Sequence, residues 1–226
     1  MKPFCTLVLM LSFWVALPAL ARAQQGPADK NIQEIVKQIH AGYDKINDLK
    51  ADFVQTVEIM DFNTPYVSKG ILFIKKGKMR WDYQEPSKQQ IYVDGGGFMY
   101  YVPDHKQVIR SKVGGNSDSH LPLNLLSGRE HLDKDFVISY EIENPVPGAP
   151  TLLRLVPKKK MGLIKIVIAT SKIAKINGLI IDKVVLHEEN GNISTSSFKE
   201  ITINQGLDDA LFVFDIPKGI EVLDAP

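Results

Sequence analysis

The residues that usually perform catalysis or bind metal ions do not form a recognisable site in this sequence. No G-x-S-x-G motif occurs, and a Ser-His-Asp triad cannot be asserted from sequence positions alone. The triple glycine Gly95–Gly97 lacks the Gly-Lys-Ser/Thr ending of a phosphate-binding loop, so we interpret it as a turn. The five histidines also lack the spacing of metal ligands: His40, His105, His120, His131 and His187. We therefore expect no metal, no cofactor and no enzymatic activity.

The sequence instead favours the burial of apolar surface, beginning with an amphipathic helix. Asn31 is predicted to cap this helix, with Glu34 as its capping-box partner, and the helix should extend to about Leu49. Gly42 lies in its interior at a cost of about 1 kcal/mol relative to alanine. The apolar stripe recurs at spacings of three and four residues: Ile32, Ile35, Val36, Ile39, Tyr43 and Ile46.

After this helix the hydrophobic period changes to two, which is typical of strands. Lys75–Lys78 and Asp94–Gly97 are predicted turns, and Asn190-Gly191 is a strong two-residue hairpin signal. The chain therefore reads as an antiparallel meander. Strands are predicted at 49–59, 70–75, 79–83, 90–93, 98–102, 137–143, 152–156, 163–170, 179–188 and 193–204.

Two short helices are predicted near the middle of the chain. Leu121–Leu126 has Pro122 in its first turn, and a second helical piece is expected within Gly128–Phe136. A single meander of this length must curl, and its concave apolar face must be covered. The predicted fold class is therefore α+β, mostly β: one antiparallel curled sheet, an incomplete or half β-barrel of about 10–11 strands. The N-terminal helix and the mid-chain insertion would form a helical lid over an apolar cavity.

The N-terminus reads as a cleavable signal peptide covering residues 1–23. Lys2 supplies the positive charge, an apolar stretch broken by Pro18 follows, and Ala21-Arg22-Ala23 is a small-x-small cleavage site. Residues 24–226 are then one exported domain. The only cysteine, Cys5, lies inside the signal, so we expect neither acylation nor disulfides.

Charge along the chain is nearly balanced. Removal of the signal leaves 25 basic and 26 acidic side chains, which argues against nucleic acid as a partner. The run Lys158–Lys160 follows Pro157 and is interpreted as a solvated loop. Contact with acidic lipid headgroups or an acidic partner is the alternative.

Several segments together resemble the periplasmic outer-membrane lipoprotein carrier family, LolA. The order and spacing of these segments, rather than any single motif, carry the resemblance, and it covers essentially the whole chain after the signal. They are Gly70–Tyr83 with Pro86, Ile91–Gly95, Tyr101–Pro103, Pro122–Gly128, the hairpin at Asn190-Gly191, and Phe212–Val222.

This resemblance implies a half-barrel with a helical lid and a function as a monomeric periplasmic carrier of a Gram-negative bacterium. Such carriers accept acylated lipoproteins from an inner-membrane ABC-type release complex and deliver them to an outer-membrane lipoprotein receptor. From face alternation and position in the resemblance, we predict that eight residues contribute to the acyl-binding face or its cover: Phe53, Phe73, Met79, Trp81, Ile91, Met99, Leu125 and Leu126.

The sequence departs from the family at the first hairpin. The family typically has Arg-Pro there, and the arginine holds the lid closed, whereas this chain has Lys76-Gly77. The ammonium group of lysine, on a flexible chain, replaces the planar guanidinium group of arginine. Either Lys76 is therefore a weaker lid latch, or Arg80 has taken over that role.

Two alternatives stay open from the sequence alone. The first is a related half-barrel that binds or senses another lipid or hydrophobic ligand in the periplasm. The second is a hydrolase whose Ser, His and Asp residues come together only on folding.

Overall fold

The structure, a computed structural model, describes residues 27–94, 97–112, 125–126, 132–142 and 150–224. The helices are α1 (Pro27–Tyr43) and α3 (Leu132–Asp135), with short 3-10 turns at Pro103–His105, Ala174–Ile176 and Asp209–Phe212. The strands are β1 (Asp48–Glu58), β2 (Tyr66–Lys75), β3 (Lys78–Glu85), β4 (Gln89–Val93), β5 (Gly97–Val102), β6 (Gln107–Lys112), β7 (Phe136–Tyr140), β8 (Leu152–Pro157), β9 (Leu163–Ile173), β10 (Gly178–Glu188), β11 (Ile193–Ile203) and β12 (Glu221–Asp224).

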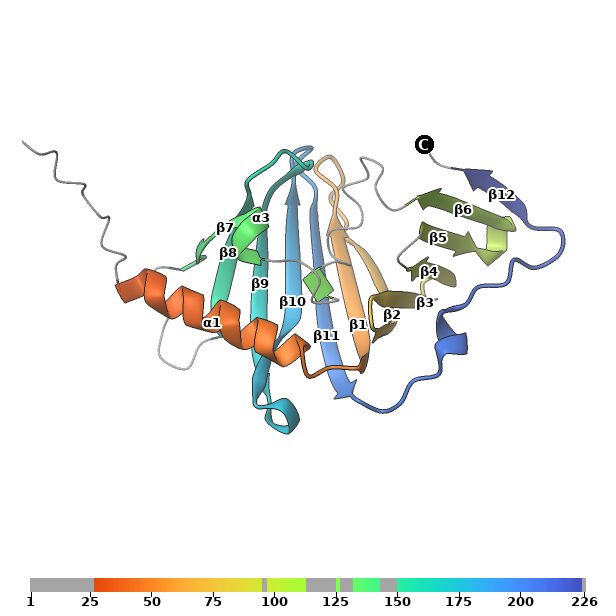
Figure 1. Ribbon diagram of the computed structural model, residues 1–226. Coiled ribbons are helices and arrows are strands. Elements are labelled where there is room, and N and C mark those ends of the chain that lie inside the picture. Colours follow the sequence, from red (N-terminus) through yellow and green to blue (C-terminus); the bar gives the residue numbers. More distant parts are fainter. Residues whose placement is uncertain (1–26, 95–96, 113–124, 127–131, 143–149, 225–226) are drawn as a thin grey trace, which may run out of the picture.

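All twelve strands form one curled sheet, which confirms the predicted fold class (Figure 1). The strand order is β12-β6-β5-β4-β3-β2-β1-β11-β10-β9-β8-β7. The ten predicted strand segments missed β6 and β12, and β12 pairs with β6 in parallel, whereas an antiparallel sheet was predicted. Strand β12 is reached by a long connection rather than by a tight hairpin, so it can enter from the same end of the sheet as β6.

Glycine shapes two of the predicted hairpins. Lys76 and Gly77 have φ angles of 42° and 80°, the combination found in a two-residue type I′ turn. Proline, whose φ is fixed near about −65°, could not occupy position 77 in this turn. The hairpin at Asn190-Gly191 is confirmed but is wider than predicted, since the Glu188 carbonyl accepts from Gly191 N–H and Glu188 N–H donates to the Asn192 carbonyl.

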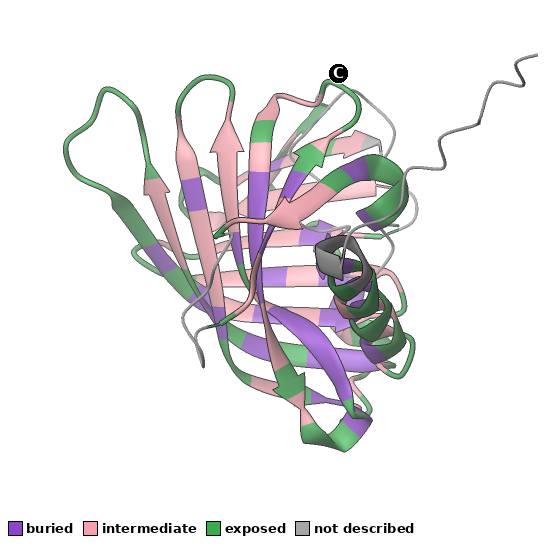
Figure 2. Cartoon of the chain, turned by 90° about the vertical axis from the view of Figure 1, so that its left-hand side faces the viewer, coloured by how far each residue is buried: buried purple, intermediate pink, exposed green. Residues whose placement is uncertain are grey.

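Helix α1 has different ends from those predicted. It begins at Pro27, a residue favoured in the first turn of a helix, so Asn31 lies inside the helix rather than capping it. It ends at Tyr43, because Leu49 already belongs to β1, where it pairs with Ile74 and Ile203. The apolar stripe of α1 lies against the concave side of the sheet, and its outer face is exposed (Figures 1 and 2).

The C-terminal end of α1 touches the sheet backbone to backbone. A β-carbon at position 42 would lie 2.3 Å from the carbonyl oxygen of Leu179, and one at position 178 would lie 2.7 Å from the Cα atom of Gly42. Gly42 is therefore required for docking of the helix on β10. Tyr43 and Lys45 add hydrogen bonds, to the backbone N–H of Ile181 (3.4 Å) and the carbonyl of Ile176 (2.8 Å).

The predicted mid-chain helices are described only in part. Leu125 and Leu126 are helical and buried, and α3 falls within the second predicted piece. The remaining residues of 113–131, including the predicted loop at 113–120, lie outside the described residues. In the part of the chain that the structure describes, none of the helices combines the length and apolar character needed to cross a membrane.

We predict that Gly42→Ala destabilises the protein, although alanine is the better helix former. The added β-carbon must displace a backbone carbonyl, and overpacking of this kind costs about 1–3 kcal/mol. Urea unfolding followed by circular dichroism measures the change in the free energy of unfolding. Ala41→Gly, at the neighbouring exposed position, is the control for helix propensity alone and should cost about 1 kcal/mol. An increase in stability for Gly42→Ala would show that the contact is not tight.

Candidate functional site

The concave face of the sheet carries a continuous row of apolar side chains. Strand register places Ala51 opposite Leu72, Leu72 opposite Trp81, and Trp81 opposite Ile91. Because side chains alternate between the two faces of a sheet, directly paired residues share a face. The four strands β1–β4 therefore build one apolar wall around Trp81.

Aromatic rings fill the centre of this wall. The Phe53 ring centroid lies 4.7 Å from that of Trp81 and 4.9 Å from that of Tyr83, both edge-to-face, and Phe198 approaches Trp81 at 5.8 Å. The indole N–H of Trp81 points to the Met79 sulfur at 3.1 Å. These arrangements match the geometry that aromatic pairs prefer, so the cluster is stable without any ligand.

The lid leucines close the interior. Leu125 and Leu126 are each 2% exposed, Phe53 is 2% exposed and Trp81 is 4% exposed, and all four belong to one core cluster. Six of the eight residues predicted for the acyl-binding face or its cover thus lie together on the concave side: Phe53, Met79, Trp81, Ile91, Leu125 and Leu126.

Phe73 and Met99 lie on the opposite, convex face. Phe73 pairs with Arg80 across the β2–β3 ladder, and Met99 pairs with Tyr92 across β4–β5. The sequence pattern failed here because β2 and β5 are apolar on both faces, so alternation gave no basis for choosing one.

Arg80 holds the C-terminal segment on the convex face. Its Nε donates to Asp82 Oδ1 at 2.7 Å, Nη1 donates to the Leu211 carbonyl at 3.0 Å, and its guanidinium lies 5.1 Å from the centre of the Tyr92 ring. Phe214, three residues further along, packs between the rings of Tyr92 and Tyr101 at 5.0 and 5.1 Å. Arg80 therefore faces away from the lid leucines.

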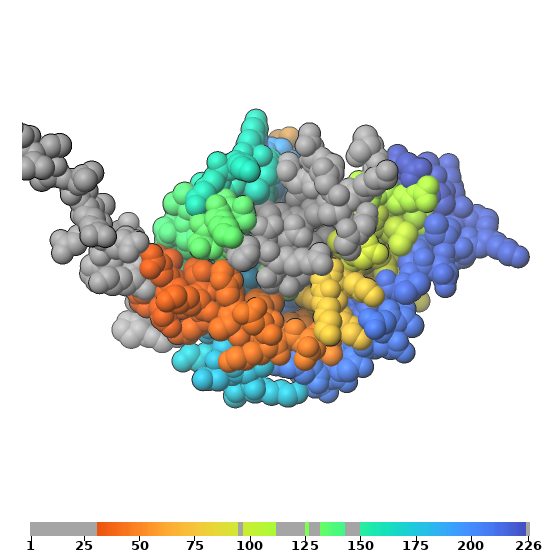
Figure 3. All heavy atoms as spheres, viewed as in Figure 1, coloured from red at the N-terminus to blue at the C-terminus, as the bar shows by residue number. Residues whose placement is uncertain are grey.

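Lys76 lies nearer to the lid. Together with Tyr43, Ile74 and Leu126 it borders a small hollow of about 50 Å³, and in Figure 3 the end of α1 lies beside the hairpin that carries Lys76. The side chain itself is exposed. Among the described residues, Lys76 thus lies on the same side of the sheet as Leu126, whereas Arg80 contacts the C-terminal segment on the convex face.

Tyr83 and Phe198 belong to the cluster but were not predicted. Tyr83 follows Trp81 at the strand period, a signal that could have identified it. Phe198 comes from β11, which lies beside β1 only through a long-range strand pairing. Burial raises the pKa of the Tyr83 phenol above its ordinary value, so the group stays neutral and donates to Gln55 Oε1 at 3.0 Å. The same cause raises the pKa of Tyr43.

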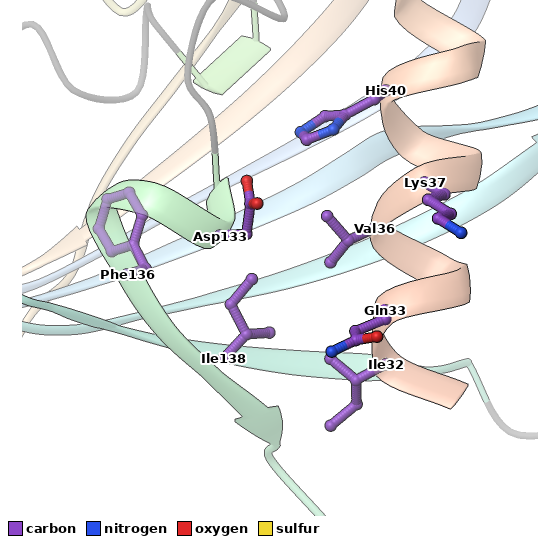
Figure 4. A pocket seen from close by; sticks show the side chains of 8 residues that line it. All are labelled: Ile32, Gln33, Val36, Lys37, His40, Asp133, Phe136 and Ile138. Carbon is purple, nitrogen blue, oxygen red and sulfur yellow. The ribbon is translucent and has the colours of Figure 1, made fainter. Parts of the chain in front are cut away.

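An opening lies between α1 and β7, at the other end of the concave face. Its volume is about 410 Å³, and Figure 4 shows Ile32, Val36 and His40 projecting from α1 toward Asp133 and Ile138. Phe136, which is 1% exposed, links its wall to the core. The described site thus combines a packed aromatic interior with one space that is already formed.

Several known proteins are similar to this chain in sequence, and a solved structure is similar to it in fold. The family model described as "Outer membrane lipoprotein carrier protein LolA" matches residues 44–215. The outer-membrane lipoprotein carrier protein of Methylococcus capsulatus is 28% identical over 214 residues, covering 94% of this chain and 97% of that protein. The one from Pasteurella multocida is 30% identical over 184 residues, covering 80% and 82%. A solved structure of an uncharacterized conserved protein from Thermus thermophilus shares the fold, with a TM-score of 0.53 at 12% identity over 86% of this chain and 99% of that one.

We predict that Arg80→Met loosens the C-terminal segment. The change removes the bond to the Leu211 carbonyl and leaves Asp82, whose side chain is 21% exposed, without its cationic partner. The expected loss is about 1–3 kcal/mol of unfolding free energy, with faster proteolytic cleavage near Leu211.

Lys69→Met is the matched control, because Lys69 forms an exposed ion pair with Glu85 on the neighbouring strand. Such pairs contribute about 0–1 kcal/mol, so this variant should be cleaved like the unmodified protein. Equal cleavage of the Arg80 and Lys69 variants would contradict the anchoring role of Arg80.

Proposed function

The chain belongs to the LolA family of outer-membrane lipoprotein carrier proteins, and from this premise we propose that it carries acylated lipoproteins across the periplasm. The observation that carries the proposal is the curled sheet whose apolar concave face is covered by helices. Acyl chains need such a surface, since each buried methylene group gains about 0.8 kcal/mol. The protein acts by binding and release rather than by catalysis.

The acyl-binding surface consists of the concave cluster and its cover. Phe53, Met79, Trp81 and Ile91 provide the wall, and Leu125 and Leu126 are the residues that an entering chain displaces. Phe73 and Met99 are not part of this surface, since both lie on the convex face. Leu125 and Leu126 are buried in the core cluster, in the space that the cargo takes when it binds.

Release requires that the closed and open forms differ little in free energy. The leucines leave the aromatic wall when cargo binds, and the cargo replaces their contacts with its own methylene groups. A ligand shifts such an equilibrium only by its differential affinity for the two forms, so a partner protein can reverse the shift. Lys76, at the edge of the lid, is placed to contribute to this balance.

We propose the remaining parts of the pathway by analogy with the family. Residues 1–23 act as the cleaved signal peptide, and the domain that follows works in the periplasm as a monomer. It accepts cargo from an inner-membrane ABC-type release complex and passes it to an outer-membrane receptor.

We predict that Trp81 reports cargo binding by its fluorescence. Trp81 lies in the middle of the wall, and the other tryptophan, Trp14, falls in the signal peptide. A triacylated lipopeptide with brominated acyl chains is added to the protein that begins at Gln24. It should quench the emission of Trp81, because bromine atoms quench tryptophan fluorescence only at short range.

The unbrominated lipopeptide is the control and should bind without quenching. A protein that binds both lipopeptides equally while Trp81 emission stays unchanged would place the acyl chains elsewhere.

Transfer of cargo from a membrane tests the function itself. We expect that inner-membrane vesicles with their release complex, incubated with ATP and this protein, yield a complex of the protein with a triacylated lipoprotein in the supernatant. If mass spectrometry finds only a small lipid bound and no lipoprotein, the carrier function is wrong.

A further inference from the structure

Of the spaces that the described residues line on the concave face, the opening between α1 and β7 is large enough for a ligand chain. Its volume of about 410 Å³ lies within the roughly 300–1,000 Å³ typical of small-ligand sites, so it can take one acyl chain but not three. The interior around Phe53 and Trp81, by contrast, is filled by Leu125 and Leu126. Binding can therefore begin at this opening without moving the lid leucines.

The walls of the opening are apolar and its rim is polar. Ile32 and Val36 come from one face of α1, and Phe136 and Ile138 come from the concave face of β7 (Figure 4). Gln33, Lys37 and Asp133 stand at the exposed border. This arrangement suits a chain that enters by its methyl end and leaves its polar head outside, where side-chain donors can reach carbonyl oxygens.

The backbone contact of α1 with the sheet lies at the C-terminal end of the helix. The helix is fixed at its C-terminal end by the Gly42–Gly178 contact and by Lys45, which donates to the Ile176 carbonyl. The opening lies along the preceding turns, from Ile32 to His40. A small rotation about the fixed end would therefore separate Ile32 and Val36 from β7 without breaking the docking on β10.

The opening is continuous with the hydrophobic core. Phe136 lines the opening and also belongs to the same core cluster as Phe53, Trp81 and Leu125. A chain that fills the opening thus lies against residues that contact the closed interior. We propose that the α1–β7 opening is the entry site for one acyl chain of the lipoprotein cargo, occupied before the lid leucines move. This inference rests on the proposed carrier function and names the first step of binding.

Filling the opening with a larger side chain tests the inference from both walls. Val36→Trp fills it from α1, Ile138→Trp fills it from β7, and Gln38→Trp places the same side chain on the exposed face of α1 as the matched control. Thermal unfolding identifies variants that fold, and the two independent filling variants keep the test open if one of them does not. The probes are a fluorescent peptide carrying one palmitoyl chain, the same peptide carrying three acyl chains, and palmitate as a competitor.

We expect the unmodified protein and Gln38→Trp to bind the monoacylated peptide equally. Val36→Trp and Ile138→Trp should raise its Kd by about tenfold or more, which corresponds to about 1.4 kcal/mol. Unchanged binding of the monoacylated peptide to a folded filling variant overturns the entry site.

The probes also separate this inference from the carrier function. If the unmodified protein binds the triacylated peptide and the filling variants bind both peptides as tightly as it does, only the entry site is wrong. If the unmodified protein binds neither peptide, the carrier function fails and the entry site with it. If palmitate binds at the opening and the monoacylated peptide does not, the site belongs to a free fatty acid, and the inference is overturned.

Discussion

The concave face of the sheet must be kept from water, and the rest of the molecule is arranged around that requirement. Curling directs Phe53, Leu72 and Trp81 to one side, and burial of each such side chain is worth about 1.5–3 kcal/mol. The sheet cannot cover this face itself, so α1 and the lid leucines do so. The apolar surface that an acyl chain requires is also the surface whose burial under α1 and the leucines stabilises the fold.

The two faces of β3 make different contacts. Trp81 points into the interior, while Arg80 and Asp82 point outward and anchor the C-terminal segment. That segment adds β12 to the edge of the sheet, so the half of the sheet farthest from α1 is supported from outside. The contact between Gly42 and Gly178 joins backbone to backbone and involves no side chain that a ligand would displace.

Much of this architecture could be predicted from local patterns. The change of hydrophobic period from 3.6 to 2 predicted a helix followed by strands, although the predicted end of the helix at Leu49 already belongs to β1. The turn residues located the hairpins, including the one at Lys76-Gly77. A long meander of short strands must curl, so the half-barrel and its need for a lid also followed. Alternation placed Trp81 and Met79 correctly on the concave side because β3 has charged residues between them.

Other features depended on segments far apart in the sequence. Local pattern made Gly42 a weak point of the helix, whereas it is required because Leu179, well over a hundred residues later, brings its carbonyl against that position. Phe73 and Met99 lie in strands that are apolar on both faces, so only their pairing with Arg80 of β3 and Tyr92 of β4 assigns them to the convex face. The sequence by itself determined the elements and the apolar face, since both arise from neighbours along the chain. The tertiary structure decided which side of each strand meets the lid and where space is left between α1 and β7, because both depend on how the curled sheet packs against its helices.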